Sequence, residues 1–352
     1  MNACVNSGMA GFLVIFLAGL VGGFAPTSLK FMRRFAYEHW GLVSSLVGFL
    51  IVPWTMLFFI CPDVPGALRA IPLRAFLVGN ALSAAWGVAN ILYCICLVRI
   101  GFSLTHGILS GIAIPAGVIT PMILKGSGVF ADAPGPLSRS GLVILLGVAM
   151  MLAAVILVSK AGFGRENSTG GGNRGKRRGG TFLAGLAMCV IAGVASIGIS
   201  FSFVYTQEAI GAAFVAHGTE AGKASAAVRV VTLLGGALVN VLYPVFLLFR
   251  NRSWGVFVAD GGRREILLAI PFGAIIIVSM VMTSVGMALL GPLGPSIGFG
   301  VNQAMQIVGS QSVGFLFGEW RGVPQRHIRT MAVAIVLLLA AVAVIAYGNA
   351  VG

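Results

Sequence analysis

Polar and aromatic side chains recur at helical spacing inside an apolar stretch in the first third of the chain. In NALSAAWGVANILYC, the residues Asn80, Ser83, Trp86, Asn90 and Tyr93 follow one another at intervals of three or four, so a helix places them on one stripe. Amides donate and accept hydrogen bonds and aromatic faces stack on C–H groups, so the stripe suits a polyhydroxylated ligand. A network of hydrogen bonds between helices would use the same residues.

A second amide-rich stripe lies late in the chain, in GFGVNQAMQIVGSQSVG. Asn302, Gln306 and Ser310 are spaced by four, and Gln303 flanks them. Because an amide without a partner is costly in hydrocarbon, these residues predict the wall of a cavity. The two stripes together predict these substrate-binding residues: Asn80, Trp86, Asn90, Tyr93, Asn302, Gln303 and Gln306.

Three ionisable residues are candidates for coupling or gating: His106, Glu208 and Arg229. Glu208 and Arg229 fall near the outer ends of two predicted membrane helices, where they could pair across a vestibule. Arg229 could instead bind an anionic substrate, or both side chains could extend to the outer surface. His106 could relay a proton or act as a structural donor. No acid falls in the middle of a predicted helix, so the residues alone do not demand proton coupling.

Catalytic and metal-binding patterns are not evident in the sequence. It has no HExxH or GxSxG motif and no acidic pair inside an apolar stretch, which argues against an enzyme. The five cysteines are typical of small apolar residues, and Cys94 and Cys96 point to different sides of a helix. We therefore expect no catalytic residues, no metal and no cofactor.

The composition is that of an integral membrane protein. Only 9% of the residues are charged, against about 25% in soluble domains, and the mean hydropathy is +1.00. The net charge of +14 could indicate nucleic-acid binding, but cytoplasmic loops of membrane proteins collect Lys and Arg in the same way. We expect the bilayer and a small molecule as partners, and no nucleic acid.

Ten segments are long and apolar enough to span a bilayer: 9–26, 41–61, 75–98, 101–124, 141–160, 181–205, 224–249, 266–290, 298–318 and 329–349. Most of the 23 basic residues fall in the odd-numbered loops between these segments, which places those loops in the cytoplasm. The sequence thus predicts a multi-pass protein of the inner (plasma) membrane with both termini outside. The basic, glycine-rich string GRENSTGGGNRGKRRGG then lies in a cytoplasmic central loop.

The chain is expected to consist of two repeats. FLAGL occurs at 16–20 and again at 182–186, and LIVPW at 50–54 has a counterpart in VLYPV at 241–245. A five-helix unit ends on the side opposite to its start, so a second copy must be inverted. We predict an all-α protein of ten transmembrane helices in two inverted five-helix repeats, 1–160 and 181–352, joined by a basic linker, 161–180.

Several strings resemble the L-rhamnose/proton symporter family of the drug/metabolite transporter superfamily. They are FAPTSLKFMRRFAYEHW, WGVANILYCICLVRIGFSLTHGI and the late GEW at 318–320. The resemblance implies an inward-directed, proton-coupled sugar carrier of ten helices, and Trp86, Asn90 and Tyr93 carry the shared motif. The family has an aromatic- and amide-rich eighth helix, whereas IIIVSMVMTSVGMALLG has no ring. The substrate is therefore open between rhamnose, another sugar and a different small metabolite.

The leading hypothesis is a secondary active transporter of a sugar or related polar metabolite that works by alternating access. An exporter of metabolites, amino acids or drugs would share the same architecture, so the fold does not choose between them. A receptor or scaffold would leave the two amide stripes without a purpose.

Overall fold

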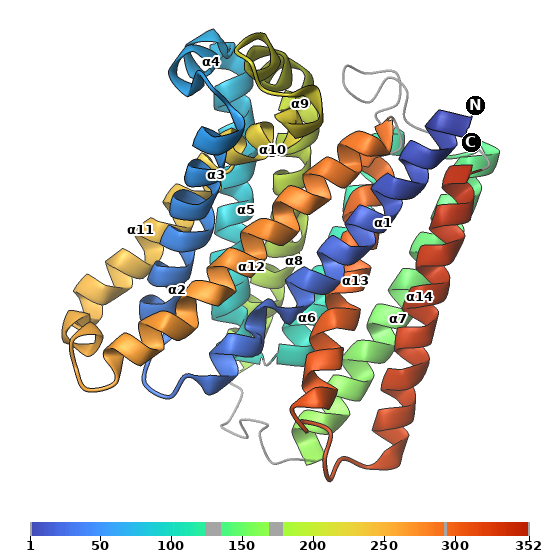
Figure 1. Cartoon of the computed structure of the whole chain (residues 1–352). Coiled ribbons are helices and arrows are strands. Elements are labelled where there is room, and N and C mark those ends of the chain that lie inside the picture. The colour runs from blue at the N-terminus through green and yellow to red at the C-terminus, as the bar shows by residue number, and fades with distance from the viewer. Residues whose placement is uncertain (1, 101, 124–134, 169–178, 292–293, 351–352) are drawn as a thin grey trace.

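The computed structural model describes residues 2–100, 102–123, 135–168, 179–291 and 294–350, and every regular element within them is helical. In chain order the elements are α1 (Asn2–Phe24), η1 (Ala25–Phe31), α2 (Tyr37–Ser45), η2 (Leu46–Ile51), α3 (Val52–Ile60), α4 (Val64–Ala70), α5 (Leu73–Ile100), α6 (Phe102–Ile123), α7 (Arg139–Ser168), α8 (Gly179–Ser196), α9 (Gly198–Ala216), α10 (Ala221–Thr232), α11 (Leu234–Asn251), η4 (Trp254–Phe257), α12 (Gly262–Leu289), α13 (Gly294–Leu316) and α14 (Gln325–Ala350). Figure 1 shows a helical bundle with both chain ends at one end.

Among the described residues, eight stretches are long and apolar enough to cross a membrane, and they match eight of the ten expected segments. The other two expected segments fall on α6, whose apolar part is the shorter Ile108–Ile123, and on α13, whose amides lower its hydropathy. Large apolar side chains such as Leu13, Phe59 and Leu242 are exposed on the outside of the bundle. Such a surface is suited to lipid rather than water.

The second expected span is one rod built from three elements, because Pro53 disturbs the helix before it. Proline has no N–H to donate, and its ring clashes with the carbonyl four residues earlier. Before this proline the chain forms a π-helical turn, η2, which directly precedes α3. Phe49 lies in this turn and is buried.

The spans expected at 181–205 and 224–249 are each found as a single apolar stretch, Leu183–Ala216 and Ala221–Asn251, with one interruption between two helices. The first break, at Ile197, separates α8 from α9, and the second, at Leu233, separates α10 from α11. Glycines at these points let α5 approach closely, since a Cβ on Gly198 would lie 2.3 Å from the Leu82 carbonyl oxygen. Backbone groups freed at a break inside a membrane need partners from neighbouring helices.

Two helices from opposite ends of the chain pack against each other near the middle of the bundle. α1 lies along both α12 and α13, and α5 lies along α8, α9 and α11. The contact between α1 and α13 depends on glycine, because Cβ atoms on Gly19 and Gly23 would lie within 2.6 Å of backbone oxygens of α13. α7 and α14 pair at one side of the bundle (Figure 1). Elements of both halves therefore surround the centre.

Candidate functional site: the central cavity

A cavity of about 320 Å³ lies where these central helices meet. Its described lining comes from α1 and η1, the π turn η2, and helices α5, α6, α8, α9, α10, α12 and α13. The volume falls at the lower end of the range for small-molecule sites, which is about 300–1,000 Å³. The space therefore suits a molecule of the size of a monosaccharide.

One wall is a chain of hydrogen bonds between α13 and α12. Gln306 Nε2 donates to Asn302 Oδ1 at 2.6 Å, Asn302 Nδ2 donates to Thr283 Oγ1 at 2.7 Å, and Thr283 donates to the Ser279 carbonyl at 2.8 Å. Gln303 also lines the cavity, and it makes no hydrogen bond with any described residue. This wall thus fixes its amides and keeps some hydrogen-bonding capacity for a ligand.

Another part of the lining combines rings with an amide. Trp86 and Phe49 meet edge to face with ring centroids 5.6 Å apart, and both line the cavity. Asn90, one turn after Trp86 on α5, donates from Nδ2 to Asn240 Oδ1 at 3.3 Å. Tyr93 continues the lining along α5. Such a wall offers an apolar surface beside a polar group.

The stripe on α5 has two roles: some of its residues line the cavity and others form hydrogen bonds between helices. Trp86, Asn90 and Tyr93 line the cavity. Asn80 lies outside it, because its Oδ1 accepts from the Gly235 N–H at 2.7 Å while its Nδ2 donates to the Phe76 carbonyl. Ser83 Oγ accepts from the Gly236 N–H at 3.1 Å. Asn80 and Ser83, the N-terminal part of the stripe, therefore cap the first turn of α11 after Leu233.

The three coupling candidates are not brought together. Arg229 lies on α10 with 2% of its surface exposed and lines the cavity. The expectation that it extends to the outer surface is wrong, because its guanidinium donates inward to Ser284 Oγ and the Ile199 carbonyl. Glu208 is exposed and makes no ion pair with Arg229 in the described part of the chain. His106 lies on α6, and its side chain is outside the described residues.

Several lining residues escaped the sequence reasoning. Phe49 could have been found from Pro53, which stands four residues later and forces the π turn. The eighth helix does supply a ring, because Phe272 of α12 precedes the ring-free stretch and lines the cavity. Ser279 and Thr283 of the same helix carry hydroxyls to the wall. Phe299 and Ser200 gave no signal in the sequence that separates them from ordinary packing residues.

Carboxylates join the two halves at the end of the bundle opposite the chain termini. Glu319 pairs with Lys30 and, at 2.5 Å, with Arg165. Burial raises the pKa of Glu319, but the Lys30 hydrogen bond and the Arg165 charge outweigh it, so that pKa lies below its usual range. Glu265 accepts from the backbone N–H groups of Arg33, Arg34 and Phe35. Glu319 and Glu265 thus link segments that are distant in the chain.

A third carboxylate at this end, Glu38, links α2 with the end of α11. Glu38 Oε1 accepts from Asn251 Nδ2 at 3.0 Å, and His39 Nε2 lies 3.0 Å from the Ser253 carbonyl oxygen. His39 Nδ1 accepts from the Ala36 N–H, so both of its ring nitrogens have structural partners. This end of the bundle is therefore tied together by polar contacts outside the cavity.

Comparison with known proteins identifies one matching family and several relatives that share one name. The model of the family described as L-rhamnose-proton symport protein (RhaT) matches residues 1–351. A protein of Cronobacter sakazakii named L-rhamnose-proton symporter is 25% identical over 334 residues, which cover 93% of each chain. Proteins of the same name from Citrobacter koseri and Pectobacterium atrosepticum are also 25% identical, and the match covers 93% and 94% of them, respectively.

Proposed function

The chain belongs to the L-rhamnose-proton symport protein (RhaT) family, and from this premise we propose that the central cavity binds a monosaccharide during transport. Family membership makes the protein a multi-pass secondary transporter of the inner membrane that moves a sugar, and not an enzyme. The exporter alternative has no support from the family or from the named relatives.

The observation that carries this proposal is the pairing of fixed amides with rings across one cavity. Asn302, Gln303 and Gln306 line a cavity whose lining also includes Trp86 and Asn90. A sugar needs hydrogen bonds for its hydroxyls and apolar contact for its C–H faces, and both are present. We propose these five residues, with Tyr93, as the substrate-binding set.

L-Rhamnose is the first substrate to test, because the relatives are named for it. As a deoxy sugar it carries a methyl group, and Phe49, Ile276 and Met280 add apolar surface to the lining. The same names pair the sugar with a proton, so we propose protons as the coupling ion.

The proposed architecture is ten spans in two inverted repeats, 1–160 and 181–352, joined by the linker 161–180, as in the drug/metabolite transporter superfamily. The helix contacts support it, because the contacts of a helix in one repeat have counterparts at the equivalent helix of the other repeat. α1 packs on α12 as α8 packs on α5, and α1 packs on α13 as α8 packs on α6. Likewise α6 packs on α7 as α13 packs on α14. A pseudo-two-fold axis through the cavity would produce this pattern. Residues 169–178 of the linker lie outside the described part.

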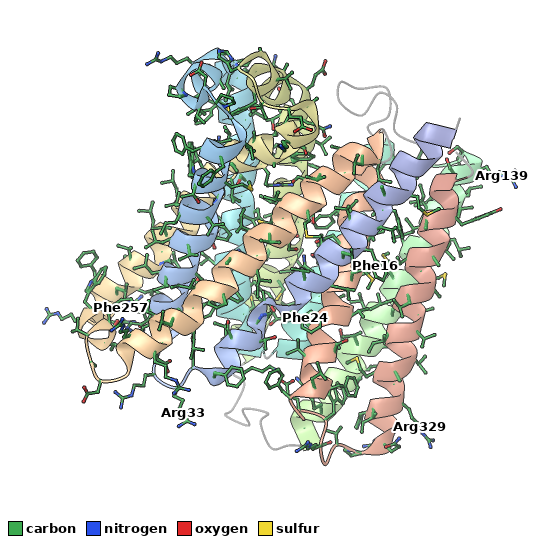
Figure 2. All side chains as sticks on the ribbon, in the orientation of Figure 1. Phe16, Phe24, Arg33, Arg139, Phe257 and Arg329 are labelled. Atoms are coloured by element: carbon green, nitrogen blue, oxygen red, sulfur yellow. The ribbon has the colours of Figure 1, made fainter. Side chains whose placement is uncertain are left out.

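The proposed orientation puts both termini outside and the linker in the cytoplasm. The ends of α7 and α8 that flank the linker lie at the end of the bundle opposite the chain termini (Figure 1). Figure 2 shows Arg33 and Arg329 at that same end, and Arg139 near the termini. Because basic residues favour the cytoplasmic side, the end with Arg33 and Arg329 is the inner one in this proposal.

Thermal stabilisation of the purified full chain tests the proposal. We expect L-rhamnose or another monosaccharide to raise Tm, at pH 6 and pH 8, and Asn302→Ala to abolish the rise because it breaks the amide chain in the cavity wall. Uptake of the stabilising sugar into proteoliposomes should then depend on an inward proton gradient. If no sugar shifts Tm and none is taken up, the sugar assignment of the cavity is wrong.

A further inference from the structure

A single charged side chain, that of Arg229, belongs to the described lining of the cavity. It lies in the apolar stretch Ala221–Asn251, which is long enough to span the bilayer. Charged side chains at such positions are costly and usually mark a ligand or ion pathway. The position of Arg229 therefore calls for a partner of opposite charge.

Within the described ranges, the groups that contact this guanidinium are neutral. Nε donates to Ser284 Oγ at 2.6 Å, Nη1 donates to the Ile199 carbonyl at 2.7 Å, and the guanidinium carbon lies 4.9 Å from the centre of the Phe203 ring. Nη2 makes no hydrogen bond to a described residue. None of the carboxylates in the described ranges forms an ion pair with Arg229.

These contacts orient the positive charge without neutralising it. Ser284 and the Ile199 carbonyl hold two of the three guanidinium nitrogens, so the plane of the group is fixed while Nη2 stays available. A buried cation without a counter-charge costs free energy that a bound anion would recover. Arginine also presents its N–H groups in a geometry that matches a carboxylate.

The anion-binding position is continuous with the amide wall. Ser284, which holds Arg229, is the neighbour of Thr283, which accepts from Asn302. A ligand can therefore place an anionic group at Arg229 and hydroxyls at Asn302 and Gln306. One cation balances one negative charge, which fits a carboxylate better than a doubly charged phosphate.

We infer that this transporter carries a sugar acid, an aldonate or uronate, whose carboxylate is held by Arg229. The inference rests on the proposed function, because it assumes that the cavity binds the transported sugar. It changes the substrate class from neutral sugar to monoanionic sugar, and it gives Arg229 the role of substrate-binding residue.

Calorimetric titration of the purified full chain at pH 7 tests this with matched pyranose pairs that differ mainly in the carboxylate: D-glucose and D-glucuronate, D-galactose and D-galacturonate. L-Rhamnonate is added as an open-chain aldonate beside L-rhamnose. We expect at least one acid to bind about 10- to 100-fold more tightly than its neutral parent, as a charged hydrogen bond would give. Arg229→Gln should reduce this preference to about onefold, and Arg229→Lys should retain part of it. Arg250→Gln, which removes an exposed cation on α11, is the control and should keep the preference.

The outcomes separate this inference from the proposed function. Binding of neutral sugars with no preference for any acid overturns the inference and leaves the proposed function standing. Absence of binding by every sugar and every acid overturns both. If Arg229→Gln does not fold, the comparison of acids with parents on the unaltered protein still decides. A preference for acids that survives in Arg229→Lys and Arg229→Gln alike would reduce Arg229 to a support for the broken helix at Ile197.

Discussion

The close approach of α1 to α13 makes Gly23→Ala a sharp test of the cavity wall. A Cβ at Gly23 would lie 2.5 Å from the Gln306 carbonyl oxygen, 2.7 Å from the Ser310 nitrogen and 2.8 Å from the Gly309 Cα. All three are backbone atoms that cannot rotate away, so α1 must move outward by about 1 Å to reach ordinary contact. Gly23, Gln306 and Ser310 all line the cavity, so this movement deforms the binding site.

Overpacking of this kind costs about 1–3 kcal/mol. At about 2–4 °C for each kcal/mol, Tm should fall by several degrees, and the affinity for the ligand that stabilises the unaltered protein should fall as well. The assay is thermal unfolding of purified protein with and without that ligand. Gly111→Ala on α6 is the matched control, because its added methyl group would meet no atom within 4 Å. If Gly23→Ala matched Gly111→Ala in Tm and affinity, the reasoning about the α1–α13 contact would be refuted.

Four further tests concern packing, ligand binding, pH dependence and orientation. Ser83→Ala removes the acceptor for the buried Gly236 N–H, so it should lower stability by about 1–3 kcal/mol and leave ligand affinity intact in a titration. Gln303→Ala should do the reverse, with little change in Tm and weaker binding, because Gln303 has no hydrogen bond to a described residue. The lowered pKa of Glu319 means that its ion pairs stabilise the protein above the ordinary carboxylate pKa and are lost as pH falls through the lowered value. As the pH falls below about 4, the free energy of unfolding should therefore decrease more in the unaltered protein than in Glu319→Gln. The difference should be less than about 1 kcal/mol because the pairs are partly exposed. A reporter fused after Arg178 should be active only in the cytoplasm, and activity outside would overturn the proposed orientation.

The sequence predicted the helical segments well because apolar length is a local property. The amide stripe on α13 was also evident, since its spacing of four residues places Asn302 and Gln306 on one face. Their mutual hydrogen bond follows from that spacing, but the bond to Thr283 of α12 does not. Which face of α13 meets which helix is decided by packing partners that are distant in the chain.

The interruptions within the spans at 181–205 and 224–249 were not predicted for the same reason. Ile197 and Leu233 lie in apolar stretches with no proline at the break, so their composition favours continuous helices. After Leu233, the approach of α5 supplies partners for the freed backbone, because Asn80 and Ser83 accept the N–H groups of the following turn. Asn80 is therefore of a residue type that suits ligand binding, but its side chain accepts a backbone N–H of α11 instead. The role of Asn80 is set by its tertiary contact with α11 and not by a local sequence signal.

The charge of the cavity bears directly on how a proton could be coupled to transport. The described lining contains no acid and no histidine, and both ring nitrogens of His39 have hydrogen-bond partners outside the cavity. A neutral sugar carried with one proton would move a net charge across the membrane, whereas a sugar carboxylate carried with one proton would not. Arg229 is positioned to hold that carboxylate, and protonation of the carboxylate would weaken its attachment to the guanidinium. If the substrate is a sugar acid, we therefore expect uptake into proteoliposomes to respond to the proton gradient but hardly to an imposed membrane potential. A strong response to potential with one proton per sugar acid would contradict this charge balance.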